Sequence, residues 1–158
     1  MAHLAARSGY DRFVRRINEY PQGAPPSELL FKILKMLMSE KEASLVALVP
    51  IKPFTAKTAA RAWKTSLFEA QKTLDALAGR ALLIDTEGRK NRYYMLPPPM
   101  AGFFEFSMMR LRGDLDQRLL AKLYYQYITV EEDFIKALFT QGETQLGRVF
   151  VNEPVLSN

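Results

Sequence analysis

The stretch Thr55–Leu96 reads TAKTAARAWKTSLFEAQKTLDALAGRALLIDTEGRKNRYYML, and its pattern carries the strongest structural signals of the chain. A short helix is predicted at 57–63, followed by a two-residue turn, and Ser66 suits the cap of a second helix. The apolar residues of this second segment recur every three or four positions, as on one helix face, at Leu67, Ala70, Leu74 and Leu77. Gly79 then predicts the end of the second helix.

A β-hairpin is predicted to follow this second helix. The apolar run 81–84 favours a strand, the polar run 87–91 a turn, and the tyrosine-rich run 92–96 a returning strand. Helix, turn, helix and basic-tipped hairpin in this order are typical of a winged helix-turn-helix. The sequence therefore predicts a mainly α fold with a small antiparallel β wing and flanking helices.

The flanking sequence divides the chain into three predicted parts. Residues 1–22 are expected to form an amino-terminal amphipathic helical arm, because their apolar residues recur at spacings of three and four. The proline-rich stretch 21–26 is stiff and extended, and it marks the boundary of that arm. Residues 23–100 are assigned to the winged-helix domain, and residues 101–158 to a carboxy-terminal helical extension that packs on it.

Further helices are predicted on both sides of the central stretch. Ser27 and Ser39 each suit the first cap of a helix, and apolar residues at intervals of four mark another helix at 114–128. Thr129, with a glutamate three residues later, predicts the capped start of the last helix. A short strand is expected at 146–151.

The composition excludes several kinds of site from these 158 residues. With zero Cys there is no disulfide, thiolate metal site, cysteine nucleophile or cysteine-held iron–sulfur cluster. His3 is the one histidine and lies close to the chain end, so the usual general base and zinc ligand are missing from the expected fold. The acidic run 131–133 is better explained as helix amino-terminal charge than as a cation site. We therefore expect no enzyme, and no catalytic, metal-binding or cofactor-binding residue.

The same sequence gives no sign of membrane insertion. No apolar run approaches the roughly 20 residues that a spanning helix needs, and the start of the chain lacks the pattern of a secretory signal. We therefore expect a soluble, cytoplasmic protein without membrane contact.

Basic residues are concentrated in the central stretch. Residues 55–92 hold eight basic and four acidic side chains, a net charge of +4, while the whole chain carries +5. Such a segment is able to follow phosphates electrostatically, although these charges also suit an ordinary solvated surface. The second helix offers Phe68 and Asp75 on its outward face, which are poor groups for reading bases. The candidate nucleic-acid contacts are Lys57, Arg61, Lys64, Ser66, Gln71, Lys72, Arg89, Lys90 and Arg92.

A dense group of aromatic and methionine side chains follows the hairpin. So much apolar surface is costly to leave in water, so we expect it in the core or against another domain, a protein partner or a second copy of the chain. The same group is also able to line a small-ligand pocket. The candidate partner surface consists of Phe103, Phe104, Phe106, Met108 and Met109.

Three segments carry a family resemblance: 13–18 with 21–27, the run PPPMAGFFEF at 97–106, and TQLGRVF at 144–150. In these segments the chain resembles the amino-terminal region of bacterial and archaeal proteins of the four-iron four-sulfur (4Fe-4S) ferredoxin type. That resemblance implies a winged-helix-like region ahead of a cysteine-rich half that binds the iron–sulfur clusters and serves electron transport. The cluster-ligating cysteines have no counterpart here, so the chain is either part of a longer protein or a relative that lacks the cluster half.

The resemblance implies a non-catalytic module. It would mediate contacts with its own cluster-binding domain, with a partner protein or with a second copy of itself. Iron–sulfur clusters are implied only for the missing half, and no cofactor is expected in this chain. The alternative hypothesis, drawn from the basic hairpin and the order of the elements, is a winged-helix DNA-binding transcriptional regulator.

Overall fold

The computed structural model describes residues 8–140, except for the side chains of 101 and 137–140. His3 and the strand predicted at 146–151 lie outside the described residues. The elements in chain order are α1 (Gly9–Ile17), α2 (Glu28–Leu37), α3 (Glu40–Val46), β1 (Phe54–Thr55), α4 (Ala56–Trp63), α5 (Leu67–Gly79), β2 (Ile84–Glu87), β3 (Arg92–Met95), the π-helical turn η1 (Pro99–Phe103), α6 (Phe104–Met109), α7 (Gln117–Tyr125), a second π-helical turn η2 (Gln126–Val130) and α8 (Glu132–Thr140).

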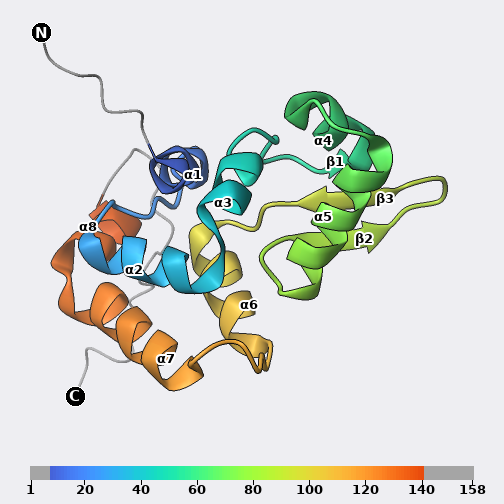
Figure 1. Cartoon of the computed structure of the whole chain (residues 1–158). Helices are drawn as coiled ribbons and strands as arrows, with labels where there is room; N and C mark the ends of the chain where they lie inside the picture. Colours follow the sequence, from blue (N-terminus) through green and yellow to red (C-terminus); the bar gives the residue numbers. More distant parts are fainter. Residues whose placement is uncertain (1–7, 141–158) are drawn as a thin grey trace, which may run out of the picture.

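These elements form two groups that Figure 1 shows side by side. One group, the sheet part, comprises α4, α5 and the three strands, while the remaining helices form the helical part. The sheet is antiparallel in the order β1-β3-β2, with both Phe54 and Asp85 opposite Tyr94 in the central strand. The predicted mainly helical fold with a small antiparallel sheet is therefore confirmed. No helix among residues 8–140 is long and apolar enough to cross a membrane.

The strand predicted at 81–84 is wrong in position, because β2 spans Ile84–Glu87. Ala81 has a left-handed backbone with φ of 57°, so the chain turns there. The turn places Leu82 and Leu83 in the core, where they are 1% and 2% exposed. Leu82 and Leu83 are thus buried in a turn, and the strand begins at Ile84, the last residue of the apolar run. The two-residue strand β1 was not predicted at all.

Serine caps fix the start of four helices. The side chains of Ser27, Ser39 and Ser66 each accept a hydrogen bond from the backbone N–H three residues later, which confirms their predicted role. Ser8 does the same for α1. The cap predicted at Thr129 is wrong, since that hydroxyl donates to the Tyr125 carbonyl at the end of α7.

Close packing of α1 on α3 brings the amino-terminal helix into the fold. The backbone N–H of Gly9 donates to the Glu40 carboxylate at 3.0 Å, and Arg16 Nε donates to the Ala47 carbonyl at 2.9 Å. A Cβ on Gly9 would lie 2.3 Å from the Glu40 carbonyl oxygen and 2.4 Å from Ser44 Oγ. Only glycine allows so close an approach of the two backbones.

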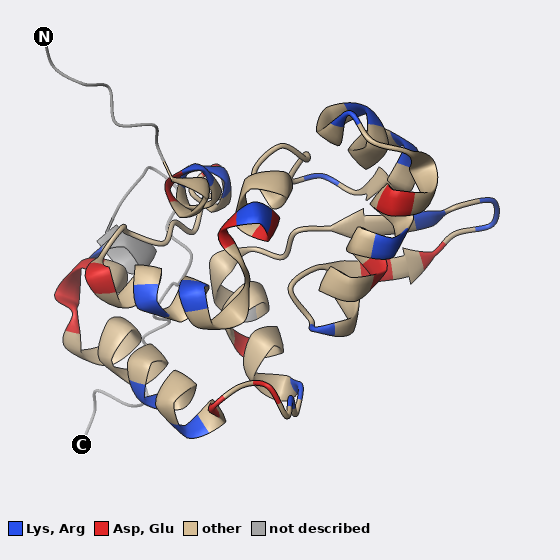
Figure 2. Ribbon diagram, viewed as in Figure 1, with Lys and Arg blue, Asp and Glu red and all other residues tan. Residues whose placement is uncertain are grey.

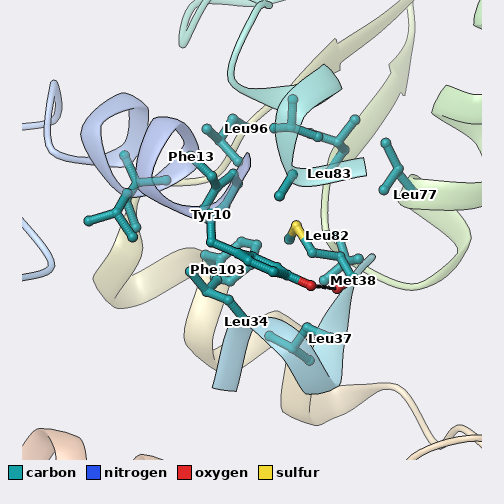
Figure 3. Close-up of a cluster of buried hydrophobic side chains, with 14 of the residues drawn as sticks. Tyr10, Phe13, Leu34, Leu37, Met38, Leu77, Leu82, Leu83, Leu96 and Phe103 are labelled. Carbon is teal, nitrogen blue, oxygen red and sulfur yellow. Dashed lines mark hydrogen bonds between the residues drawn. The ribbon is translucent and has the colours of Figure 1, made fainter. Parts of the chain in front are cut away.

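One core joins the two groups of elements. Side chains from α1, α2, α5, the α5–β2 turn and η1 meet in it, as Figure 3 shows for Phe13, Leu34, Leu77, Leu82 and Phe103. Side chains from all three predicted parts of the chain, 1–22, 23–100 and 101–158, contribute to this core.

Aromatic rings extend this core through the helical part. Phe103 lies 5.4 Å from Phe13 and 6.1 Å from Phe104, between ring centroids. Phe104 in turn lies 5.1 Å from Tyr124, 5.8 Å from Tyr127 and 5.8 Å from Phe134. Phe103 and Phe104 are 0% and 2% exposed, so their assignment to a partner surface is corrected: other helices of the same chain cover them.

Tyrosine hydroxyls satisfy backbone carbonyls where segments meet. Tyr10 donates to the Met38 carbonyl at 3.0 Å (Figure 3), and Tyr127 donates to the Pro25 carbonyl at 2.8 Å. The Tyr20 hydroxyl lies 2.9 Å from the Ile51 carbonyl and also within hydrogen-bond distance of the Leu96 carbonyl. These bonds offset the cost of burying polar backbone groups.

Replacement of Gly9 by alanine is expected to destabilise the fold. The added Cβ would overlap the α3 backbone, and overpacking of this kind costs about 1–3 kcal/mol in the free energy of unfolding. Gly79→Ala is the matched control, because a Cβ there meets nothing within 4 Å and gains helix propensity. Urea denaturation of the two variants measures the difference, and equal stabilities would contradict the close packing of α1 on α3.

Candidate functional site

Basic residues lie on α4 and at the hairpin tip (Figure 2). Lys57 and Arg61 are exposed on α4, and Lys64 follows the helix in a left-handed conformation with φ of 54°. The turn is closed by a hydrogen bond from the Thr65 N–H to the Ala60 carbonyl at 3.0 Å. At the hairpin tip, Gly88 N–H donates to the Asn91 carbonyl at 2.9 Å, and the two basic residues between them are exposed.

Six of the nine candidate nucleic-acid contacts are exposed cations that make no ion pair within the described residues. They are Lys57, Arg61, Lys64, Lys72, Arg89 and Lys90. They come from three places: α4 with its following turn, the outer face of α5, and the hairpin tip.

The other three candidates are engaged within the chain. Ser66 Oγ accepts from the Glu69 N–H at 3.1 Å as the cap of α5. Gln71 Nε2 donates to the Asp75 carboxylate at 3.1 Å and also contacts the hydroxyl of Tyr94. Since Ser66 Oγ and Gln71 Nε2 already make hydrogen bonds within the chain, they are less available to read bases.

Arg92 is the third of these engaged candidates, and it joins the hairpin to α5. Its guanidinium lies 3.3 Å from Asp75 Oδ1 and also pairs with Asp85 on the neighbouring strand. The charge of Arg92 is therefore largely compensated by two carboxylates. Its side chain orients the hairpin against α5, and it has little charge left for a phosphate.

The Asp75–Tyr94 pair is the centre of this network. The Tyr94 hydroxyl donates to Asp75 Oδ1 at 2.6 Å. Burial, followed by the hydrogen bond and charge of Asp75, raises the pKa of Tyr94 to about 12. Burial alone would raise the pKa of Asp75, but hydrogen bonds from Tyr94 and Gln71 and the charge of Arg92 bring it below its ordinary value. The network therefore favours a neutral tyrosine and an ionised aspartate at neutral pH.

The first turn of α5 presents apolar side chains to solvent. Phe68 is 74% exposed and Leu67 is 48% exposed. The expected inward orientation of Leu67 is wrong, because the buried stripe of α5 begins only at Ala70 and continues through Leu74 and Leu77. Leu67 and Phe68 are two large apolar residues next to each other in the sequence, which is a sign that not both can face the core. Helical spacing alone placed Leu67 on the same face as the core residues of α5.

A groove of about 530 Å³ lies beside these two residues, between α4, the start of α5 and the start of β3. We name it the α4–α5 groove, and its lining residues are Thr55, Ala56, Lys57, Leu67, Phe68, Gln71, Asn91 and Arg92. Its size is within the range of about 300–1,000 Å³ that is usual for binding pockets. The groove therefore combines an apolar wall from α5 with basic side chains from α4 and β3.

A second hollow of about 470 Å³ lies between the end of α5, β2 and α6. It includes Phe106 and Met109 from the candidate partner surface, together with Ile84, Asp85 and Arg110. Met109 is 75% exposed, while Phe106 and Met108 are half-buried. Of the five candidates, Phe106 and Met109 line this hollow, and its other lining residues are not aromatic.

No group of three or more potential metal ligands occurs among residues 8–140. Comparison with protein-family models, with curated proteins and with solved structures finds no match for this chain.

Tyr94→Phe is expected to lower the free energy of unfolding by about 1–2 kcal/mol at pH 7, because it removes a hydrogen bond to an ionised carboxylate. The pKa of Tyr94 is raised from 10.0 to about 12. The contribution of the protonated Tyr94 hydroxyl to the free energy of unfolding is therefore fully present below pH 10 and is lost as the pH rises through 12. The stability gap between wild type and variant should therefore narrow over this interval.

Urea denaturation between pH 8 and pH 12 checks this narrowing. Tyr125→Phe is the control, since Tyr125 is 65% exposed and its replacement should leave the free energy of unfolding almost unchanged. A gap for Tyr94→Phe that stays constant up to pH 12 would show that the Asp75–Tyr94 bond does not stabilise the fold.

Proposed function

We propose that this chain is a non-catalytic winged-helix module through which a 4Fe-4S ferredoxin-type protein contacts a protein partner or its own cluster-binding domain. The winged-helix assignment is supported by the order α3, β1, α4, α5, β2, β3 and by the sheet order β1-β3-β2. In this arrangement α5 takes the place of the recognition helix and the β2–β3 hairpin takes the place of the wing. The proposal keeps the cytoplasmic location expected from the sequence.

The single observation that carries the contact role is the exposed pair Leu67 and Phe68 beside the α4–α5 groove. Aromatic and aliphatic side chains gathered at a pocket are typical of the energetic centre of a protein interface. On the same helix, Gln71 and Asp75 are hydrogen-bonded to each other, so α5 offers few free polar groups to a DNA base edge. This balance favours a protein partner over a nucleic acid.

The iron–sulfur part of the proposal rests on the resemblance of three segments to ferredoxin-type proteins. Clusters of this type are held by cysteine thiolates, and this sequence contains zero Cys. The residues of this chain therefore do not fit a cluster. Its proposed role is to bind and position another polypeptide, and no electron-transfer step is assigned to it.

Association with a cluster-binding half tests this function. The chain is mixed with the cysteine-rich half of a ferredoxin-type protein, supplied as a separate polypeptide with its clusters loaded. Sedimentation velocity and native mass spectrometry should detect a complex at micromolar concentrations, because interdomain contacts bury apolar surface that is exposed in the separate chains. Absence of a complex in both measurements would count against the proposal.

DNA binding is the second candidate, and the six exposed cations on α4, α5 and the hairpin tip favour it. If they contact phosphates, the wild type should bind a duplex at low salt and lose affinity as the salt concentration rises. Replacement of Arg89 and Lys90 together by glutamate should then weaken binding at least tenfold. Fluorescence anisotropy with a labelled duplex measures this effect.

Lys32→Glu with Lys35→Glu is the matched control for this test, because it makes the same charge change on exposed residues of α2. The control should leave the duplex affinity close to that of the wild type. Equal effects of the two double variants would indicate a response to net charge alone, and absence of binding at low salt would remove this candidate.

A further inference from the structure

We propose that the α4–α5 groove binds a short acidic peptide segment that carries an apolar anchor, presented by the protein partner. This inference rests on the proposed function, and it names the docking site and the chemistry of the segment that occupies it. It draws on three features of the groove: its apolar wall, its uncompensated positive charge, and the internal bracing of its hairpin side.

The apolar wall provides the anchor site. Phe68 and Leu67 are 74% and 48% exposed, and both line the groove together with Thr55 and Ala56. An aliphatic or aromatic side chain placed against Leu67 and Phe68 would remove apolar surface from water, which contributes about 25 cal/mol per Å². Phe68 has two side-chain torsions, so ordering it against an anchor costs little conformational entropy.

The charge at the groove selects an acidic segment. Lys57 lines the groove. Lys57, and Arg61 and Lys64 farther along α4 and its turn, make no ion pair within residues 8–140. On α5, Lys72 lies four residues after Phe68 and therefore on the same helix face. Glu69 and Asp75, both on α5, are the acidic residues nearest to these cations in sequence, and Asp75 is paired with Arg92.

The hairpin side of the groove offers no uncompensated positive charge from Arg92, and it is held in place. Arg92 lines this side, but Asp75 and Asp85 compensate its charge and hold its guanidinium between α5 and β2. Arg89 and Lys90 lie beyond it at the exposed hairpin tip. The attraction for an acidic segment therefore comes mainly from the α4 side, and Lys57 is its nearest contributor.

These features fit a peptide better than a nucleic acid. A duplex would approach the same cations, but its phosphates gain nothing from contact with the large apolar side chains of Leu67 and Phe68. An acidic segment with one apolar anchor uses both properties at the same time. The dependence of binding on Phe68 therefore separates the two kinds of ligand.

Three labelled synthetic peptides test the inference by fluorescence anisotropy with the whole chain. They are Glu-Glu-Leu-Phe-Glu-Glu, its basic counterpart Lys-Lys-Leu-Phe-Lys-Lys, and the anchorless Glu-Glu-Ser-Ser-Glu-Glu. The first peptide should bind at least tenfold more tightly than either of the others, and its affinity should fall as salt is added. Equal binding of all three peptides, or tighter binding of the basic one, would overturn the proposal.

Two variants locate the binding site. Phe68→Ser should weaken binding of the acidic anchored peptide about tenfold, and Lys57→Glu should weaken it to a similar extent while reducing its salt dependence. The controls are Leu111→Ser, which removes another apolar side chain that is 90% exposed, and Lys35→Glu on α2. Because all four residues are exposed, thermal unfolding should be nearly unchanged, and this is measured alongside.

The outcomes distinguish this inference from the proposed function. If the cluster-binding half associates with the chain and Phe68→Ser leaves that affinity unchanged, the module function stands and the groove is not its docking site. If a DNA duplex displaces the peptide and binds equally well to Phe68→Ser, the surface is a nucleic-acid site and the inference fails. Loss of both peptide and cluster-half binding in Phe68→Ser, with both controls unaffected, supports the inference.

Discussion

The later helices of this fold, from η1 to α8, pack around one ring, that of Phe104. It is 2% exposed and lies within 6.1 Å of four other aromatic rings, which come from η1, α7, η2 and α8. The chain reaches this position directly from the sheet, because Gly102 packs so closely on Pro97 and Pro98 that a Cβ would lie 3.0 Å from each. The bend after β3 thus delivers two consecutive phenylalanines into the core.

This arrangement shows which parts of the fold can be predicted from local sequence. The caps at Ser39 and Ser66 follow from chemistry within one helical turn, and they were predicted correctly. The end of α5 at Gly79 agrees in position, although the left-handed residue of the turn is Ala81. The strand at 81–84 and the inward position of Leu67 were wrong, because contacts with distant segments decide them. Apolar periodicity indicates that a residue is suited to burial, but it does not identify the segment that covers that residue.

In the candidate site, too, features set by local sequence could be predicted, and features set by contacts between distant segments could not. The cations of α4 and the hairpin tip could be recognised in the sequence, since exposed charge needs no partner within the chain. The compensation of Arg92 by Asp75 could not, because these residues lie in separate elements that only the folded chain brings together. The exposed pair beside the groove was visible as two adjacent apolar residues, but the hollow itself depends on the placement of β3 next to α5.

The hydroxyl of Tyr20 lies where the chain crosses between the helical part and the sheet part. The chain passes from the helical part to the sheet part near Ile51 and returns near Leu96, and one tyrosine hydroxyl lies within hydrogen-bond distance of both carbonyls. A single hydroxyl hydrogen must be shared between them. Tyr20 therefore ties the two crossings to each other through one side chain, so loss of this hydroxyl would leave the carbonyls of Ile51 and Leu96 without their shared donor.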